Sequence, residues 1–283
     1  MSAVVMGAVA YDPKVVTIWD GFRRWFRDHD LDFDYVLYSN YERQAEELVA
    51  GRVDAAWNSP LAWVRTDRLA RSAGRKAHAL TMRDTDRDLS SVVIVRDDSP
   101  IRSVNDLRGT VIGTGAVDSP QATLIPLSYL RANGLAPGRD VTVRRFDIGV
   151  GLHGDHIGGE RDAARALVAG DVDAACVIDG NHLAFANEGT LPRGSTRIVG
   201  RTALYDHCNM TVLEPDEPAV AQFGGLLRSM SYADAAVRPL LDLEGLKQWE
   251  AGRVSGYDAL TTAVDETGFY DADGDVTAAD YRP

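Results

Sequence analysis

Apolar and polar positions follow two periods along this chain, one typical of short strands and one typical of helices. Short apolar runs predict strands close to the start of the chain and at 32–39, 53–57, 141–149 and 172–179. Apolar residues at helical spacing predict helices over 14–29, 40–51, 120–133, 159–170 and 218–232. Strands that alternate with helices in this way are typical of α/β proteins with parallel sheets.

An internal repeat shows how these elements are grouped. The segment ELVAGRVDAAW at 47–57 returns as ALVAGDVDAAC at 166–176. Each copy contains the end of a helix, a glycine that can take the positive φ needed after a helix, and a short apolar strand. Gly51 and Gly170 occupy this position. Because each copy closes a β-α-β unit, the repeat predicts two α/β lobes of similar topology.

Two crossover segments are expected to connect the lobes. SSVVIVRDDSP at 90–100 would leave the first lobe, and CNMTVLEP at 208–215 would return to it. The C-terminal part of the chain would then complete lobe one. We therefore predict that residues 1–92 and 207–283 form lobe one and that residues 93–206 form lobe two.

Polar residues follow the predicted strands at their carboxyl ends. In open α/β sheets, ligands bind beyond these ends, and in a two-lobed protein the two sets of ends face each other across a cleft. The sequence therefore predicts a ligand cleft between the lobes. The candidate residues at strand ends and helix starts are Tyr11, Asn58, Ser59, Asp118, Ser119 and Asp179.

Charge and composition narrow the classes of function. The 283 residues carry a formal net charge of -12, which makes binding to nucleic acid or to an anionic membrane unfavourable at long range. No apolar run has the length of a membrane span, so no membrane insertion is expected. The start of the sequence has no visible leader, which indicates a cytoplasmic protein as the sequence stands, or a periplasmic or extracellular one if a leader was removed.

The order of several segments resembles a known family. YDPKVVTIWDGF, GRVDAAWNSPLAWV, SVVIVRDDSPIRSVNDLRGTVIG, SPQATLIPLSYLRANGL and GLKQWEAGRVSGYDAL are similar to pieces of type 2 periplasmic binding proteins. Within that group the chain resembles the phosphate, phosphite and phosphonate substrate-binding proteins of ABC transporters. The resemblance covers nearly the whole chain. It implies a two-lobed fold, a small-molecule ligand and an ABC permease as partner.

The resemblance also suggests individual binding residues. In that family a Ser/Thr-rich turn at a helix N-terminus holds the anionic group, where free N–H groups and the helix dipole favour negative charge. The matching turn here contains Ser119, Gln121 and Thr123. Asp179 matches a family aspartate that binds an amine of the ligand. Glu160 stands where the family tends to have a histidine.

Carboxylates near the matching turn depart from the family pattern. Asp118 adjoins the expected anion pocket, and Glu160 is a poor partner for a phosphonate. Together with Asp179 they favour a cationic, zwitterionic or metal-bound ligand. The resemblance thus implies the fold, while the class of ligand stays open.

The glycine-rich segment GLHGDHIGGE at 151–160 has two interpretations. His153, His156 and Glu160 are the residue types of a two-histidine, one-carboxylate site for a divalent transition metal. Its glycines equally suit a flexible loop that covers the cleft. On both interpretations the segment lines or covers the cleft, because it immediately precedes a helix whose family counterpart contacts the ligand.

A second candidate for chemistry lies at the expected return to lobe one. His207 is a candidate acid/base group or a further metal ligand, and Cys208 is a candidate nucleophile. These residues keep an enzyme alternative open, because some cytoplasmic lyases and decarboxylases share the fold. On that alternative His153, His156, Glu160 and His207 supply acid/base or metal chemistry. The first interpretation is a ligand-binding protein without catalysis.

Overall fold

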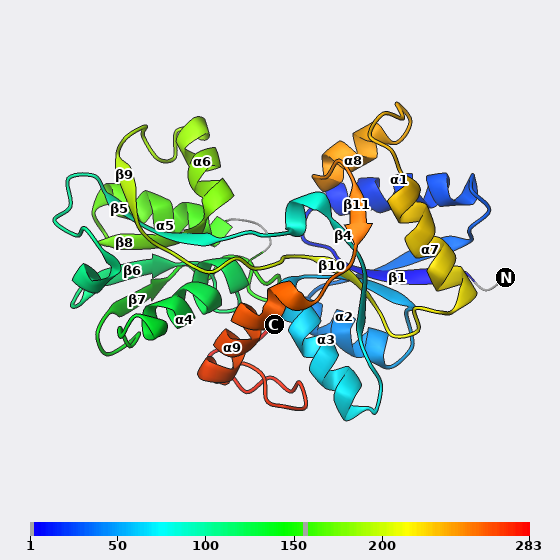
Figure 1. The fold of residues 1–283 in the computed structure, drawn as a ribbon, viewed down its shortest axis with the longest axis horizontal. Helices are drawn as coiled ribbons and strands as arrows, with labels where there is room; N and C mark the ends of the chain where they lie inside the picture. The colour runs from blue at the N-terminus through cyan, green and yellow to red at the C-terminus, as the bar shows by residue number, and fades with distance from the viewer. Residues whose placement is uncertain (1–2, 155–157) are drawn as a thin grey trace.

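The computed structural model describes residues 3–154 and 158–283 and consists of two α/β lobes side by side (Figure 1). The first sheet contains, in spatial order, β11 (Trp249–Ala251), β4 (His78–Arg83), β10 (Asn209–Val212), β3 (Ala55–Asn58), β1 (Val4–Val9) and β2 (Phe33–Tyr38). The second contains β7 (Thr142–Arg145), β6 (Val111–Thr114), β8 (Ala174–Ile178), β5 (Ser91–Arg96) and β9 (Thr196–Arg201). The predicted two-lobed α/β fold is confirmed.

Helices cover both faces of each sheet, as Figure 1 shows. The first sheet lies between α1 (Lys14–Arg27), α7 (Pro218–Ser229) and α8 (Arg238–Glu244) on one face and α2 (Tyr41–Val49) and α3 (Pro60–Ser72) on the other. The second lies between α5 (Gly158–Ala169) and α6 (Asp179–Glu188) on one face and α4 (Ile125–Ala132) on the other. Because both faces are covered, central strands such as β3 and β10 are buried along their whole length.

The sequence repeat corresponds to one structural unit in each lobe. The strands of the two copies, β3 and β8, belong to different sheets. Gly51 and Gly170 have φ values of +71° and +83°, as the predicted position after each helix requires. The aspartate of each copy makes the same bond, since Asp54 Oδ2 accepts the Val5 N–H and Asp173 Oδ2 accepts the Val111 N–H, both at 2.8 Å. This bond ties the repeat strand to the start of its parallel neighbour.

One predicted helix begins with a different geometry. The segment expected to be helical over 120–133 starts as a π-helical turn, η3 (Pro120–Leu124), before α4. Ser119 caps this turn, because its hydroxyl accepts the Ala122 N–H at 3.2 Å while its carbonyl accepts the Leu124 N–H at 3.0 Å. A wide turn of this kind is often found at functional sites, and here it faces the other lobe.

Two extended segments join the sheets, one between β4 and β5 and one between β9 and β10. They run side by side. The backbone N–H of Leu89 donates to the Tyr205 carbonyl and the N–H of Tyr205 donates to the Leu89 carbonyl, both at 2.8 Å. The Tyr205 hydroxyl also lies 2.8 Å from Ser91 Oγ. The first segment includes the short turn η1 (Asp84–Asp86). The division at residues 92–93 and 206–207 stays a prediction; β5 already begins at Ser91.

The C-terminal part does more than complete the first lobe. Helix α9 (Asp258–Thr267) follows the turn η4 (Ser255–Tyr257) and packs against α3 of one lobe and α4 of the other (Figure 1). One hydrophobic cluster accordingly contains Leu61 of α3, Ile125 of α4 and Leu260 of α9. No helix in the described part of the chain combines the length and apolar character needed to cross a bilayer.

Candidate functional site

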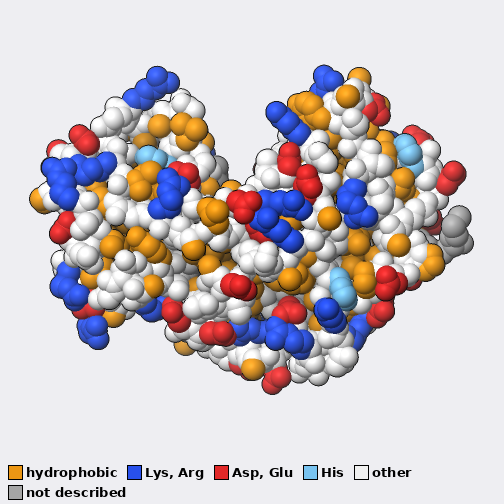
Figure 2. Space-filling view, in the orientation of Figure 1, with side chains coloured by type: hydrophobic (Ala, Val, Ile, Leu, Met, Phe, Trp, Pro, Cys, Tyr) orange, Lys and Arg blue, Asp and Glu red, His pale blue; other side chains and the backbone are white. Residues whose placement is uncertain are grey.

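The candidate site lies where the edges of the two sheets face each other, and Figure 2 shows the surface hollowed between the lobes. In the first sheet β1 and β3 are parallel, and β4 runs the same way because β10 is antiparallel to both β3 and β4. Their carboxyl ends therefore share one edge. The start of β10 lies at that edge as well, which brings His207 and Cys208 beside the residues that follow β1 and β3.

A cavity of about 140 Å³ opens at this edge of lobe one. One of its lining residues, Tyr11, belongs to the predicted ligand set, and two others, His207 and Cys208, are the predicted chemical candidates. The remaining lining residues are Lys14, Tyr41, Trp57 and Arg83. The guanidinium of Arg83 lies over the Trp57 ring at 5.3 Å. The cavity thus combines aromatic walls with two cationic side chains.

His153 crosses from lobe two into lobe one and is fully buried there. Its Nδ1 lies 2.6 Å from Ser59 Oγ, and its Nε2 donates to Glu42 Oε1 at 2.8 Å. Its ring stacks on Tyr41 with a centroid distance of 4.9 Å. The part of the glycine-rich segment that the structure describes, residues 151–154, therefore reaches across the interface between the lobes.

The acceptor of this histidine is a buried carboxylate. Glu42 Oε1 also accepts the Tyr270 hydroxyl at 2.7 Å. Burial alone would raise the pKa of Glu42, but the charge of His153 and hydrogen bonds from His153, Tyr270 and Tyr281 lower that pKa to about 2. Glu42 is therefore ionised at neutral pH and holds His153 inside lobe one.

Asp118 holds the backbone of the same loop. Its Oδ2 accepts the N–H groups of Gly151 at 2.7 Å and His153 at 3.2 Å. The Gly151 carbonyl in turn accepts the Tyr41 N–H at 3.1 Å. Burial raises the pKa of Asp118, against the opposing charge of His153 and the N–H group of Gly151. Asp118 thus contacts the chain's own loop at the position where repulsion of a ligand was expected.

The predicted anion-binding turn lies under this loop. Gln121 Nε2 donates to the Gly154 carbonyl at 2.7 Å, and a Cβ placed on Gly154 would lie 2.4 Å from Ser119 Oγ. Two buried oxygens of the turn, Gln121 Oε1 and Thr123 Oγ1, have no hydrogen-bond partner among the residues that the structure describes. The loop therefore covers the turn and leaves part of its hydrogen-bonding capacity unused.

The other two carboxylates of the predicted set lie in lobe two. Glu160 is buried, and its Oε2 accepts the Ile178 N–H and the Asn181 amide, both at 2.9 Å. Burial raises the pKa of Glu160, against these hydrogen bonds. Asp179 is partly exposed and forms a 2.7 Å ion pair with Arg201. A neighbouring cation therefore balances Asp179.

Asn58 lies inside lobe one, with its side chain engaged there. Its Nδ2 donates to Thr211 Oγ1 at 2.9 Å and to Thr66 Oγ1 at 3.2 Å, and its Oδ1 accepts the Gln44 amide at 2.8 Å. These bonds connect β3, α3, β10 and α2. The geometry thus favours a structural role for Asn58, beneath the cavity.

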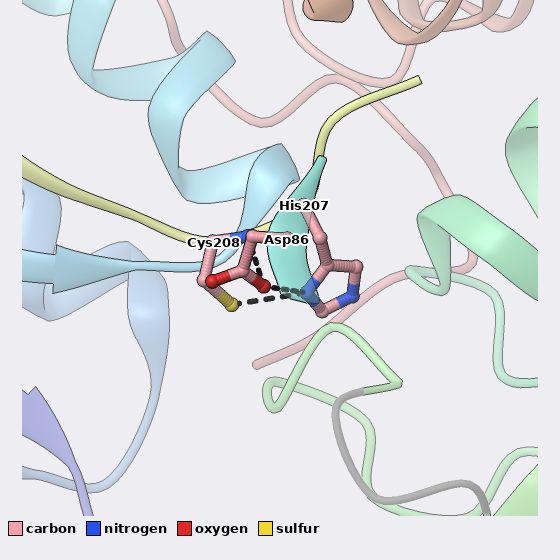
Figure 3. Close-up of side chains that lie close together, drawn as sticks. All are labelled: Asp86, His207 and Cys208. Carbon is pink, nitrogen blue, oxygen red and sulfur yellow. Dashed lines mark hydrogen bonds and ion pairs between the residues drawn. The ribbon is translucent and has the colours of Figure 1, made fainter. Parts of the chain in front are cut away.

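His207 and Cys208 meet a third residue that sequence reasoning missed. The ring Nδ1 of His207 lies 3.1 Å from Cys208 Sγ and 3.5 Å from Asp86 Oδ1 (Figure 3). In the described ranges 3–154 and 158–283, this cluster alone brings three potential metal-ligating side chains together. The metal set predicted in the loop is not assembled in the same way: His153 and Glu160 have separate partners, and His156 lies outside the described residues.

For some site residues that were not predicted, the sequence contains a signal that could have found them. Arg83 ends β4, whose carboxyl end lies at the same edge as those of β1 and β3, but the short segment HALTMR was not recognised as a strand. Tyr41 and Glu42 follow β2 at the same edge, immediately after the capping residue Asn40. No local pattern marks Tyr270 as a partner of Glu42, because the two are 228 positions apart.

Comparisons with known proteins agree with this geometry. The family model for the ABC transporter phosphonate periplasmic substrate-binding protein matches residues 8–257. No curated protein matches the sequence. Among solved structures, PhnD1 from Prochlorococcus marinus in complex with methylphosphonate has a TM-score of 0.70 at 14% identity, covering 95% of this chain and 99% of that one.

Two further structures have the same fold. XAC2383 from Xanthomonas citri bound to ATP has a TM-score of 0.70 at 20% identity, covering 94% of this chain and 98% of that one. A binding-protein component of an ABC phosphonate transporter from Pseudomonas aeruginosa has a TM-score of 0.58 at 14% identity, covering 93% and 94%. At these identities the structures establish the fold.

The family match decides between the two interpretations of function. It favours a small-molecule binding protein over a lyase, decarboxylase or metal-dependent enzyme. The matched range includes both repeat units, both crossovers and every residue of the cavity. The chain therefore belongs to the family of periplasmic substrate-binding proteins of phosphonate ABC transporters.

Proposed function

We propose that this protein binds a small anionic solute in the cavity at the edge of lobe one and delivers it to an ABC permease. The observation that carries the proposal is the lining of the cavity. It includes the cations Lys14 and Arg83 and the aromatic side chains Tyr11, Tyr41 and Trp57, and the described residues that line it include no carboxylate. A few polar groups on aromatic walls are typical of small-molecule sites.

The volume of the cavity supports a small solute. About 140 Å³ is available, against roughly 30 Å³ for each molecule of liquid water. A phosphonate, phosphate or sulfonate head with a short substituent is of this order. An anionic head suits the ammonium of Lys14, because the guanidinium of Arg83 already donates to both oxygens of Asp86. The aromatic walls suit an apolar substituent.

The buried carboxylates near the interface do not oppose this choice of ligand. Asp118 is turned to the loop backbone, and Arg201 balances Asp179. Burial raises the pKa of Glu160, which favours its neutral form. The local arrangement therefore supports an anionic ligand over the cationic or zwitterionic one that the residue types alone had favoured.

The position of the loop also supports a site on the lobe-one side. His153 occupies the N-terminus of α3 at Ser59, and Gly154 covers the π turn at Ser119. Both helix starts, which could otherwise hold an anion, contact the chain itself. The solute would then bind next to the loop, against the ends of β1, β3 and β4.

Calorimetry with a charge variant tests the proposal. Methylphosphonate is the first probe, because it is the ligand of the similar PhnD1 structure, and inorganic phosphate and a short alkylsulfonate are the others. We expect Lys14→Ala to weaken binding of the best probe by at least about tenfold, equivalent to about 1.4 kcal/mol. Lys76→Ala is the matched control, because Lys76 is exposed just before β4, at the opposite end of that strand.

Two results would contradict the proposal. One is the absence of heat with all three oxyanions while a cationic solute binds. The other is an equal loss of affinity for Lys14→Ala and Lys76→Ala, which would indicate a general effect of charge.

The permease partner is tested separately, by measuring whether loaded protein stimulates ATP hydrolysis by the reconstituted transporter.

A further inference from the structure

Three side chains with metal-binding chemistry meet where the two crossovers run side by side. Asp86 ends the turn that follows β4, and His207 and Cys208 immediately precede β10 (Figure 3). We propose that Asp86, His207 and Cys208 form a binding site for one transition-metal ion of the Zn²⁺ class. This site is distinct from the metal set predicted in the glycine-rich loop.

The backbone holds the three residues in place without an ion. The His207 N–H donates to the Asp86 carbonyl at 2.7 Å, and the Cys208 N–H donates to Asp86 Oδ1 at 3.2 Å. Tyr257 donates its hydroxyl to the His207 carbonyl at 2.8 Å. Pre-positioned ligands lose little conformational freedom when an ion binds, and this favours affinity.

Two of the three distances between the ligand atoms are close to those around a tetrahedral ion. One nitrogen, one sulfur and one carboxylate oxygen lie within 4.8 Å of one another. The Nδ1–Sγ and Nδ1–Oδ1 distances are 3.1 and 3.5 Å. Bonds of about 2.0 Å to nitrogen and oxygen and about 2.3 Å to sulfur place neighbouring ligands of a tetrahedron roughly 3.3–3.7 Å apart. Small side-chain rotations therefore suffice to bring all three to one ion.

The types of ligand select the class of ion. Thiolate and imidazole favour Zn²⁺ and neighbouring late transition metals over Mg²⁺ and Ca²⁺, which prefer oxygen. The cluster is largely buried, with Asp86 and Cys208 at 1% and 3% exposed. Burial protects the site from bulk water and strengthens each bond to the ion.

The charges around the cluster balance when an ion of charge two binds. Arg83 donates to both oxygens of Asp86 and reaches Glu244 Oε1 at 3.4 Å. The positive charge of Arg83 and the negative charge of Glu244 cancel. The carboxylate of Asp86 and a thiolate at Cys208 then offset the charge of the ion.

A fourth coordination position would face the cavity. His207 and Cys208 both line the 140 Å³ space together with Arg83. Three protein ligands and one open position are the pattern of zinc sites that bind a further molecule. An ion there would present positive charge to water or to an oxyanion in the cavity.

Cobalt substitution tests the site on the full chain. The protein is freed of metal with a chelator and titrated with Co²⁺, which gives strong absorption when a thiolate binds it. We expect saturation at one ion per chain, displacement by Zn²⁺ and loss of the thiolate–cobalt band in Cys208→Ser. His207→Ala is expected to weaken Co²⁺ binding at least tenfold.

The second cysteine provides a matched control. Cys176 lies in the core of lobe two, where burial raises the pKa of its thiol to about 12. Cys176→Ser should therefore keep the full thiolate–cobalt band. A wild-type protein without that band, a band retained in Cys208→Ser, or a band lost in Cys176→Ser would each overturn the proposal. Circular dichroism checks that each variant is folded.

A measurement on the wild type removes any dependence on the folding of variants. X-ray absorption of the Zn²⁺-loaded protein should show one sulfur at about 2.3 Å and nitrogen or oxygen neighbours at about 2.0–2.2 Å. Zinc surrounded by nitrogen and oxygen without sulfur would overturn the assignment. When the calorimetric titrations with solutes are made on metal-free protein, failure of this site and failure of the proposed solute binding are distinguishable.

Discussion

The buried carboxylate of Glu42 connects three parts of this protein. It is 4% exposed, and its Oε1 accepts hydrogen bonds from His153 of one lobe and from Tyr270 of the C-terminal segment. A buried charge is tolerated only when a counter-charge and hydrogen bonds compensate for the loss of water. Glu42 therefore contributes an electrostatic contact to the interface between the lobes.

Replacing this carboxylate should destabilise the protein. Glu42→Gln removes the partner charge of His153 while the ring stays buried, and we expect a loss of about 2–4 kcal/mol in the free energy of unfolding, measured in urea. Glu46→Gln on the same helix is the control, since Glu46 pairs with Arg65 at 3.0 Å but is 44% exposed. That pair should contribute at most about 1 kcal/mol. Equal losses would contradict a special role for Glu42.

The same residue predicts a dependence on pH. The pKa of Glu42 is lowered from 4.5 to about 2, so its stabilising effect is fully present above 4.5 and is lost as the pH falls from there through about 2. The difference in unfolding free energy between wild type and Glu42→Gln should shrink as the pH is lowered from neutral to about 3. Urea unfolding at a series of pH values measures this difference; a gap that stays constant would argue against the assignment.

At the scale of elements, the loop between β7 and α5 has a backbone that glycine makes possible. Gly149, Gly151 and Gly154 have φ values of +73°, +85° and +66°, and His153 also has a positive φ of +51°. Residues with a Cβ rarely adopt this region. The loop can therefore pack closely against the π turn at Ser119. The hydrogen bonds of the buried His153 ring offset the backbone strain of its positive φ.

Two alanine substitutions separate backbone strain from close packing. Gly154→Ala and Gly149→Ala both place a Cβ at positive φ, which costs about 1 kcal/mol each. The Cβ at Gly154 would also lie 2.7 Å from Ser119 Cβ, while the Cβ at Gly149 meets nothing nearer than 3.5 Å. Gly154→Ala should therefore lose a further 1–3 kcal/mol or so in urea unfolding. If the two variants lose the same stability, the loop does not pack on Ser119 in solution.

At the scale of the whole molecule, two features hold the lobes together besides the crossovers. The loop inserts His153 between Ser59 and Glu42, and α9 packs on helices of both lobes. Binding proteins of this architecture close by rotation at their crossovers. Here the chain supplies contacts across the interface itself, which favours a closed arrangement before any solute binds.

Small-angle scattering can measure this closure. His153→Ala removes the ring that connects lobe two to lobe one. The buried carboxylate of Glu42 then loses its counter-charge and is stabilised by hydration, so the lobes should open. We expect the radius of gyration to rise by roughly 1 Å from a value of about 19 Å for a compact chain of this length. His182→Ala is the control, because His182 bonds Thr196 within lobe two at 3.0 Å. A radius unchanged in His153→Ala would show that α9 and the crossovers maintain closure alone.

Local sequence was sufficient to predict the repeated elements of the two lobes, although strands such as β4 were missed. The repeat placed β3 and β8 in separate sheets, and Gly51 and Gly170 adopt the conformation expected at helix ends. Periodicity, capping and turn chemistry depend on residues close in sequence, so a single chain reveals them. The rule that ligands bind at carboxyl ends of strands also predicts which edge of each sheet faces the ligand, and this edge stays a prediction.

Tertiary structure alone decided which residues meet at that edge. His153 pairs with Glu42, 111 positions away, and Cys208 meets Asp86 at a distance of 122 positions. Such pairs depend on how the two crossovers orient the lobes, and no periodicity or cap records that orientation. For the same reason Asp118, which was expected to repel an anion, instead holds the loop backbone. Local interactions thus determined the repeated elements, while the packing of one lobe on the other determined the partners of buried side chains such as His153 and Glu42.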